Sequence, residues 1–155
     1  ITYGIAVRKL QMNKSDEEKE TDLQNIPDPV KRQARKETME KGIDAPIVMN
    51  SLRKAGEFLD QLEANIEDSG WIAGDKFSMA DACTLPYIQR LDHLALSEAF
   101  SEEKRPKINK WYKKVKDVNF FDKAVTSQIP TPLVKMMNAF GEEVKDKALT
   151  LMEEN

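Results

Sequence analysis

The chain has 155 residues, with 24 Lys and Arg against 27 Asp and Glu, a formal net charge of −3, one Cys and one His. This length is typical of one domain with its own core. A single cysteine excludes a disulfide framework and a cysteine-based zinc cluster. The net negative charge argues against a nucleic-acid-binding domain. No run of apolar residues is long enough to cross a membrane, and we expect a protein of the reducing cytoplasm.

The first forty residues predict helices joined by polar segments. Apolar residues from Ile1 to Met12 recur at helical spacing, which indicates a helix already under way when the chain begins. Because no initiator methionine is present, we expect an upstream segment. The charged segment 13–22 is either an exposed helical extension or a loop. The sequence of residues 27–29, Pro-Asp-Pro, predicts a turn that opens a polar helix over 30–41, which Gly42 ends.

Residues 47–66 give the clearest helical pattern in the chain. Their apolar residues follow one another at steps of 4, 3, 4, 3 and 4, which places them on one face of a helix: Val48, Leu52, Ala55, Leu59, Leu62 and Ile66. Phe58 widens this stripe, and charged residues occupy the opposite face. We therefore expect a long amphipathic helix that ends by Gly70.

A second strong signal begins at Ser78, because Ser78 and Asp81 have the spacing of a capping box. The serine hydroxyl of such a box accepts a hydrogen bond from the backbone N–H three residues on, and the carboxylate accepts one from the serine N–H. Asp81 is the only charged residue from Phe77 to Gln89, so we expect the helix that follows to be buried on all sides at the centre of the fold. Pro86 lies within this helix and is expected to bend it.

Three further helices are predicted after this central one. Residues 104–118 form a helix with Pro106 in its first turn, residues 120–125 form a short helix, and residues 133–151 form a last amphipathic helix. Alternating patterns typical of strands are hard to find. The sequence therefore predicts an all-α bundle of six or seven helices, in which residues 1–155 form a single domain.

The segment that leads into the central helix carries a family motif. Residues 70–81 read Gly-Trp-Ile-Ala-Gly-Asp-Lys-Phe-Ser-Met-Ala-Asp, which closely resembles the segment Trp-Leu/Ile-x-Gly-x-x-Phe/Pro-Ser/Thr-x-Ala-Asp of the glutathione transferase C-terminal domain. Residues 106–111 resemble the Pro-x-Ile/Leu-x-x-Trp helix that comes next in that family, and residues 120–125 resemble the short helix after it. The resemblance covers about residues 47–125 and implies the all-helical fold of that domain.

The resemblance also implies a divided function. In this family a thioredoxin-like N-terminal half binds the co-substrate glutathione and carries the Ser, Tyr or Cys that stabilises its thiolate. The helical half supplies one wall of the pocket for a small electrophilic substrate and part of a homodimer interface. No pattern of the N-terminal half occurs in these residues, so we expect the helical half alone, without catalytic residues of its own and inactive by itself. The alternative is a non-enzymatic protein-interaction module, because the same helical domain occurs in elongation-factor and synthetase-associated subunits.

Family members line the electrophile pocket with one face of the central helix and with the start of the first helix. The resemblance therefore implies four substrate-binding candidates: Tyr3, Arg8, Tyr87 and Arg90. An arginine there favours an anionic or polarised acceptor, and a tyrosine hydrogen-bonds to it or stacks on it. The structural alternative is that Tyr87 belongs to the core and that Arg90 pairs with Asp92 or Glu98.

Three other residues that often carry chemistry have structural explanations. Asp81 can be interpreted as a catalytic acid or base, but its position in the capping box explains its presence. Cys83 lies on the same helix face as Tyr87 and has no basic neighbour in the sequence, so we expect an inert, buried thiol. His93 has no second histidine or spaced cysteine with which to form a metal site.

The segment from Lys104 to Lys116 contains seven Lys or Arg residues, and such a run can mark a nucleic-acid-binding face. However, Ile108, Trp111 and Val115 form an apolar stripe on the opposite side, and cations late in a helix interact favourably with its dipole. We therefore interpret the segment as a solvated basic face. We expect no nucleic-acid partner and no membrane partner.

Overall fold

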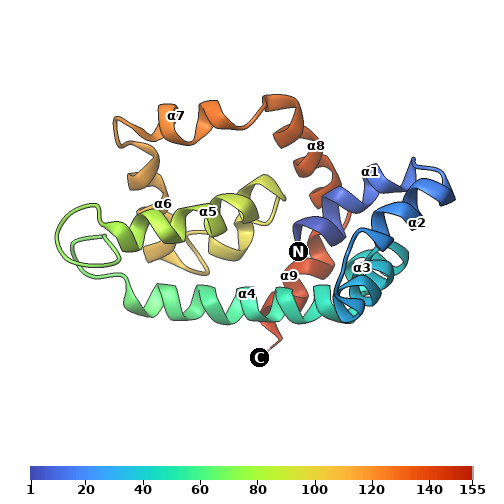
Figure 1. Ribbon diagram of the computed structural model, residues 1–155. Coiled ribbons are helices and arrows are strands. Elements are labelled where there is room, and N and C mark those ends of the chain that lie inside the picture. The colour runs from blue at the N-terminus through green and yellow to red at the C-terminus, as the bar shows by residue number, and fades with distance from the viewer. Residues whose placement is uncertain (155) are drawn as a thin grey trace.

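The computed structural model describes residues 1–154, and every regular element within them is helical (Figure 1). The nine α-helices are α1 (Arg8–Met12), α2 (Asp16–Gln24), α3 (Pro29–Lys41), α4 (Pro46–Asn65), α5 (Met79–His93), α6 (Pro106–Lys116), α7 (Phe121–Ala124), α8 (Thr131–Glu142) and α9 (Lys145–Glu153). A π-helical turn over Tyr3–Val7 precedes α1. The prediction of an all-α fold is confirmed, although the helices outnumber the six or seven expected.

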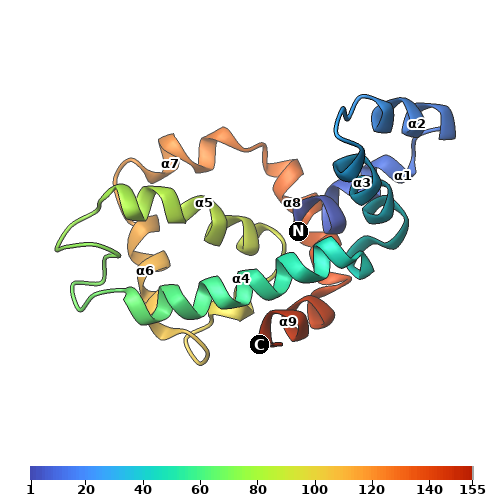
Figure 2. The same cartoon turned by 60° about the horizontal axis from the view of Figure 1, so that its bottom comes forward.

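The long helix α4 forms one side of the molecule, and α5 runs beside it in the opposite direction in both views (Figure 1 and Figure 2). The segments α6 to α8 wrap around the other side of α5, while α1, α2 and α3 gather at the end of the molecule where α4 begins. Among residues 1–154, no helix combines the length and the apolar character that crossing a bilayer needs.

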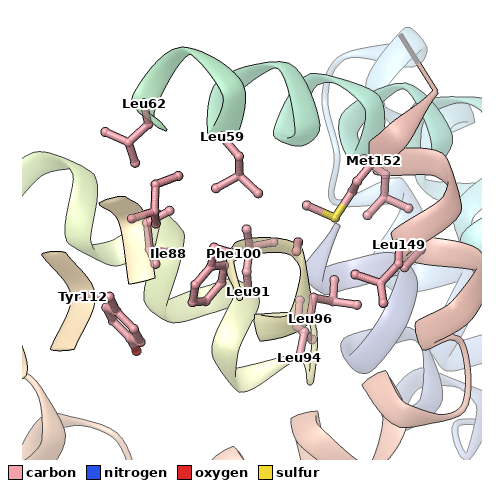
Figure 3. Packing of buried hydrophobic residues seen from close by; sticks show 14 of the residues in the cluster. Leu59, Leu62, Ile88, Leu91, Leu94, Leu96, Phe100, Tyr112, Leu149 and Met152 are labelled. Atoms are coloured by element: carbon pink, nitrogen blue, oxygen red, sulfur yellow. The ribbon is translucent and has the colours of Figure 1, made fainter. Parts of the chain in front are cut away.

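The core lies where α4, α5 and α9 meet. Figure 3 shows Leu59 and Leu62 of α4 facing Ile88 and Leu91 of α5, with Met152 of α9 beside them. The side chains of all five are at most 6% exposed. The apolar stripe of residues 47–66 is therefore the core-facing side of α4, as its spacing predicts.

The charged segment near the N-terminus is helical. Helix α2 begins with a capping box in which Glu18 N–H donates to Ser15 Oγ at 3.2 Å and Ser15 N–H donates to Glu18 Oε2 at 2.8 Å. Helix α3 is capped by Asp28, whose Oδ1 accepts from the Val30 N–H at 2.9 Å. The helical alternative for this segment is thus the correct one, and its start is set by a local cap.

The C-terminal part differs from the prediction, because the single helix expected over 133–151 is two helices. The chain leaves helical geometry at Val144, with φ −124° and ψ 9°, between α8 and α9. A Cβ at Gly141 would lie 3.0 Å from Leu94 Cα and closer still to the Leu94 carbonyl oxygen. The end of α8 therefore lies directly against the backbone after α5, and the chain turns there so that α9 packs along α4.

Helix α5 also differs from the prediction, because only one side of it is buried. Its core-facing residues are Asp81, Leu85, Ile88 and Leu91, whereas Met79 and Tyr87 on the other side are 76% and 67% exposed. Cys83 is exposed as well, so the expectation of a buried thiol is wrong. An apolar composition indicates that a helix face prefers burial, but it does not show that this chain provides the covering element.

Helix α6 receives its N-terminal cap from a distant residue. Its own N-cap residue, Arg105, makes no capping hydrogen bond. Instead, Glu63 of α4 accepts hydrogen bonds from the backbone N–H groups of Lys107 and Ile108, both at 2.9 Å. This carboxylate satisfies two of the free N–H groups of α6 and lies at the positive end of its dipole.

We expect Glu63→Ala to destabilise the fold by about 1 kcal/mol, because two backbone donors lose their partner. Urea unfolding followed by circular dichroism measures this change. Glu57→Ala is the matched control, since Glu57 is an exposed residue of the same helix and should change stability by less than about 0.5 kcal/mol. Equal effects of the two changes would contradict this capping role.

Candidate functional site

A groove of about 780 Å³ lies between α4 and α5, and the N-terminal residues also line it. Its lining residues come from three segments: Ile1 and Thr2; Ser51, Lys54, Ala55 and Phe58; and Pro86, Tyr87, Arg90 and Leu91. On α4, the other lining residues lie beside the core-facing stripe to which Ala55 belongs. On α5, Leu91 faces the core and the other lining residues lie on the more exposed sides of the helix. The volume is in the range of small-molecule sites.

Two aromatic side chains form the apolar wall of the groove. The rings of Phe58 and Tyr87 have centroids 6.0 Å apart and are tilted by 56°. Ala55 adds only a methyl group between them and the N-terminal end, which leaves room for a ligand. Phe58 is half-buried and Tyr87 is largely exposed. The flat ring of a ligand can therefore pack against Phe58 at the bottom of the groove and against Tyr87 at its solvent-exposed edge.

Arg90 is the charged group at the centre of the α5 wall. One of its guanidinium nitrogens donates to Met137 Sδ at 3.0 Å, and sulfur is a weak acceptor. The alternative pairing with Asp92 or Glu98 is not formed: Asp92 accepts a hydrogen bond from the Tyr112 hydroxyl at 2.9 Å, and Glu98 pairs with lysines. Among residues 1–154, Arg90 makes no ion pair, so its charge is available to a ligand.

Tyr3 and Arg8 do not line this groove, because both face α3. The guanidinium of Arg35 lies 3.5 Å from the centre of the Tyr3 ring. Arg8 donates to the carbonyl oxygens of Met39 and Glu40 at 2.7 and 3.1 Å, near the end of α3, where a cation satisfies free carbonyl groups. The structure thus brings Tyr87 and Arg90 together and places Tyr3 and Arg8 elsewhere.

Phe58 and Lys54 belong to the groove but were not among the residues expected there. The sequence pattern places Phe58 at the edge of the apolar stripe and Lys54 on the solvent-exposed face of the same helix. Both descriptions are correct for the isolated helix. Only the packing of α5 against α4 shows that the border between the two faces lines a groove.

Asp81 is fully buried and accepts hydrogen bonds from three residues. Ser78 donates twice to Oδ2, from its N–H at 2.8 Å and from its hydroxyl at 2.7 Å. The Ile72 N–H and Trp111 Nε1 donate to Oδ1 at 3.1 and 2.8 Å. The backbone N–H of Asp81 also approaches Ser78 Oγ and completes the capping box, although this contact has poorer geometry than the hydrogen bonds that the Asp81 carboxylate accepts.

The electrostatics of Asp81 fit a structural role. Burial by itself raises the pKa of this carboxyl, but the hydrogen bonds from Ser78, Ile72 and Trp111 outweigh burial and hold the pKa below its ordinary value. The carboxylate is therefore charged at neutral pH. It lies in the core rather than on the wall of the groove, so the arrangement does not support acid–base catalysis by this residue.

The remaining titratable residues of α5 do not form a reactive cluster. Burial, and then repulsion by Arg90, lower the pKa of His93, and its Nδ1 has no hydrogen-bond partner in the described structure. Residues 1–154 contain no group of three or more His, Cys, Asp or Glu side chains placed to hold a metal ion.

The basic segment 104–116, which includes α6, makes many contacts within the chain. Lys104, Arg105 and Lys113 pair with carboxylates. Lys107 and Lys114 donate to the backbone carbonyl oxygens of residues 66 and 69, at 3.0 and 2.8 Å. These contacts favour the interpretation of a solvated basic face over that of a nucleic-acid-binding face.

Comparison with known proteins gives one family match. The family model described as "Glutathione S-transferase, C-terminal domain" matches residues 26–117, which include α3 to α6, both helical walls of the groove and the Ser78–Asp81 box. No curated protein and no solved structure gives a significant match to the chain.

Proposed function

This chain belongs to the family of glutathione S-transferase C-terminal domains, and from that premise we propose that residues 1–155 are a single domain that binds the electrophilic substrate of a glutathione transferase. In the complete protein, a thioredoxin-like domain binds glutathione and supplies the group that stabilises its thiolate. The thiolate sulfur forms a bond to an electrophilic carbon, and the leaving group departs with the electron pair of the broken bond. The helical domain holds the acceptor in position for this attack.

The observation that carries this proposal is the groove between α4 and α5. Its aromatic wall suits a flat apolar acceptor. The guanidinium of Arg90, which makes no ion pair within residues 1–154, suits a polarised or anionic group on that acceptor. Tyr87 and Arg90 are the substrate-binding residues that we propose, together with Phe58. Arg8 is proposed to be structural, because its guanidinium is used at the end of α3.

We also propose that the complete protein is a cytoplasmic homodimer. The support for a dimer is the family match, since the helical half of a glutathione transferase forms part of a homodimer interface. Sedimentation of the complete protein measures its state directly, and a monomer at micromolar concentration would contradict the dimer.

Conjugation by the complete protein tests the proposed function. We expect it to bind immobilised glutathione and to convert glutathione and an aryl halide into the thioether with release of halide, whereas residues 1–155 alone give no product. Mass spectrometry of the product measures both reactions. A complete protein that neither binds nor consumes glutathione, but purifies with stable protein partners, would instead support a non-enzymatic interaction module.

A further inference from the structure

The groove between α4 and α5 carries positive charge that its own wall does not balance. Two of its lining residues from the helices, Lys54 and Arg90, are cationic, and none of its lining residues is an aspartate or a glutamate. The chain as a whole has more acidic than basic residues. A pocket with cations alone is therefore a local departure from the average surface of this protein.

The partners of these two cations leave both charges available. Within residues 1–154, the one hydrogen bond that the Arg90 side chain makes is to the weak sulfur acceptor of Met137. Lys54 is exposed and forms no ion pair in the same residues. The half-buried Phe58 and the buried Leu91 lie beside Arg90 in the groove. Because apolar neighbours exclude water, an anion that reaches Arg90 is held more strongly than one on an open surface.

The positive character continues into the adjoining pocket. This second pocket, of about 370 Å³, shares Ile1 and Ser51 with the groove and contains Lys31 and Arg35 without any carboxylate in its lining. By contrast, the pocket of about 320 Å³ near Arg8 mixes cations with Asp16, Glu20 and Glu40. Among these three pockets, the excess of positive charge is thus confined to the two that are lined by α3, α4, α5 and the N-terminal residues.

We propose that the groove selects aromatic acids as its acceptors: the ring of the substrate lies against Phe58 and Tyr87, and its carboxylate or sulfonate binds the guanidinium of Arg90. A guanidinium binds a planar carboxylate through two parallel hydrogen bonds, and Lys54 at the rim attracts the anion during approach. This inference rests on the proposed function, since it names the chemical class of the acceptor for that same site.

Two fluorescent probes that share one ring system test this inference. Anilinonaphthalene sulfonate is an aromatic anion, and N-phenylnaphthylamine is the same ring system without the sulfonate. Titration of the 155-residue chain with each probe should give tighter binding of the sulfonate at a low salt concentration of about 20 mM. Salt at about 500 mM should weaken sulfonate binding severalfold and leave amine binding unchanged.

Substitutions then locate the charge and the ring. Arg90→Gln should weaken binding of the sulfonate about tenfold and change binding of the amine less than about twofold. Arg90→Lys keeps the charge but not the two parallel hydrogen bonds, so it should restore part of the sulfonate binding. Phe58→Ala should weaken both probes. Arg53→Gln is the matched control, because Arg53 lies on the same helix as Phe58 but pairs with Glu154 outside the groove; it should change neither. Circular dichroism shows that each variant is folded.

Four results would overturn the inference. The first is an equal loss of binding of both probes in Arg90→Gln, and the second is tighter binding of the neutral amine than of the sulfonate by the parent chain. The third is unchanged binding of both probes in Phe58→Ala. The fourth is loss of sulfonate binding in the complete protein, which would mean that a protein segment fills the groove. Neither glutathione nor turnover enters this experiment. A complete protein that conjugates neutral aryl halides, but binds the sulfonate independently of Arg90, would therefore refute the acceptor class and leave the proposed function intact.

Discussion

Gly56→Ala is expected to destabilise the chain by about 3 kcal/mol, although the same change inside a helix usually stabilises a protein. Gly56 lies on the side of α4 that faces α9. A Cβ at this position would lie 2.8 Å from the carbonyl carbon and 3.1 Å from the Cα of Met152, and closer still to the Met152 carbonyl oxygen. Because these are backbone atoms, no side-chain rotation relieves the clash, and α9 has to move away from α4.

Urea unfolding followed by far-UV circular dichroism measures this loss. Hydrogen exchange adds a local measurement, since the amides of α9 should lose protection before those of α4. Ala64→Gly is the reverse change at an exposed position of α4 and should cost no more than about 1 kcal/mol. A Gly56→Ala protein as stable as the parent would show that α4 and α9 do not pack as closely as described.

Asp81→Ala is expected to destabilise the chain by about 4 kcal/mol, because it leaves buried donors without an acceptor. The Trp111 indole N–H and the Ile72 N–H lose their partner, and α5 loses its cap. Asp81→Asn should cost about half as much, since its amide oxygen still accepts from one of these donors. Tryptophan emission, which comes from the buried Trp71 and Trp111, follows global unfolding.

The loss caused by Asp81→Ala should also depend on pH. Because the folded state holds the pKa of Asp81 below its unfolded value, near 3.8, the stabilisation is complete above that unfolded pKa and is lost as the pH falls through the lower folded pKa. The stability difference between parent and variant should therefore be constant near neutral pH and shrink in acid. Asp75→Ala, at an exposed aspartate of the loop that precedes α5, is the control and should show neither effect. A pH-independent difference for Asp81 would contradict this linkage.

The parts of the fold that depend on local signals could be predicted from the sequence. The apolar stripe of α4 follows from its spacing, and the start of α5 follows from the capping box, because both depend on residues within one or two helical turns. The break at Val144 depends instead on the contact of Gly141 with the Leu94 backbone. No periodicity in the sequence reports a contact between segments so far apart along the chain.

In the candidate site, too, the residues that a local pattern places could be predicted, and those that depend on packing between distant segments could not. Tyr87 and Arg90 share a helix face at a spacing that the sequence displays, and both line the groove. Tyr3 and Arg8 lie instead against α3, because α3 packs against the N-terminal segment that carries them. Phe58 was expected to extend the core stripe. Its role in the groove depends on the position of α5, which no local pattern fixes.

The central claim, that this helical domain holds the acceptor, is tested most directly by the steady-state kinetics of Tyr87→Ala in the complete protein. Tyr87 is largely exposed, so its loss should leave the fold intact. We predict that KM for an aryl acceptor rises about fivefold while KM for glutathione is unchanged. Leu133→Ala, an exposed apolar position outside the groove, should change neither constant. An unchanged acceptor KM in Tyr87→Ala, or an equal rise in both constants, would contradict the claim.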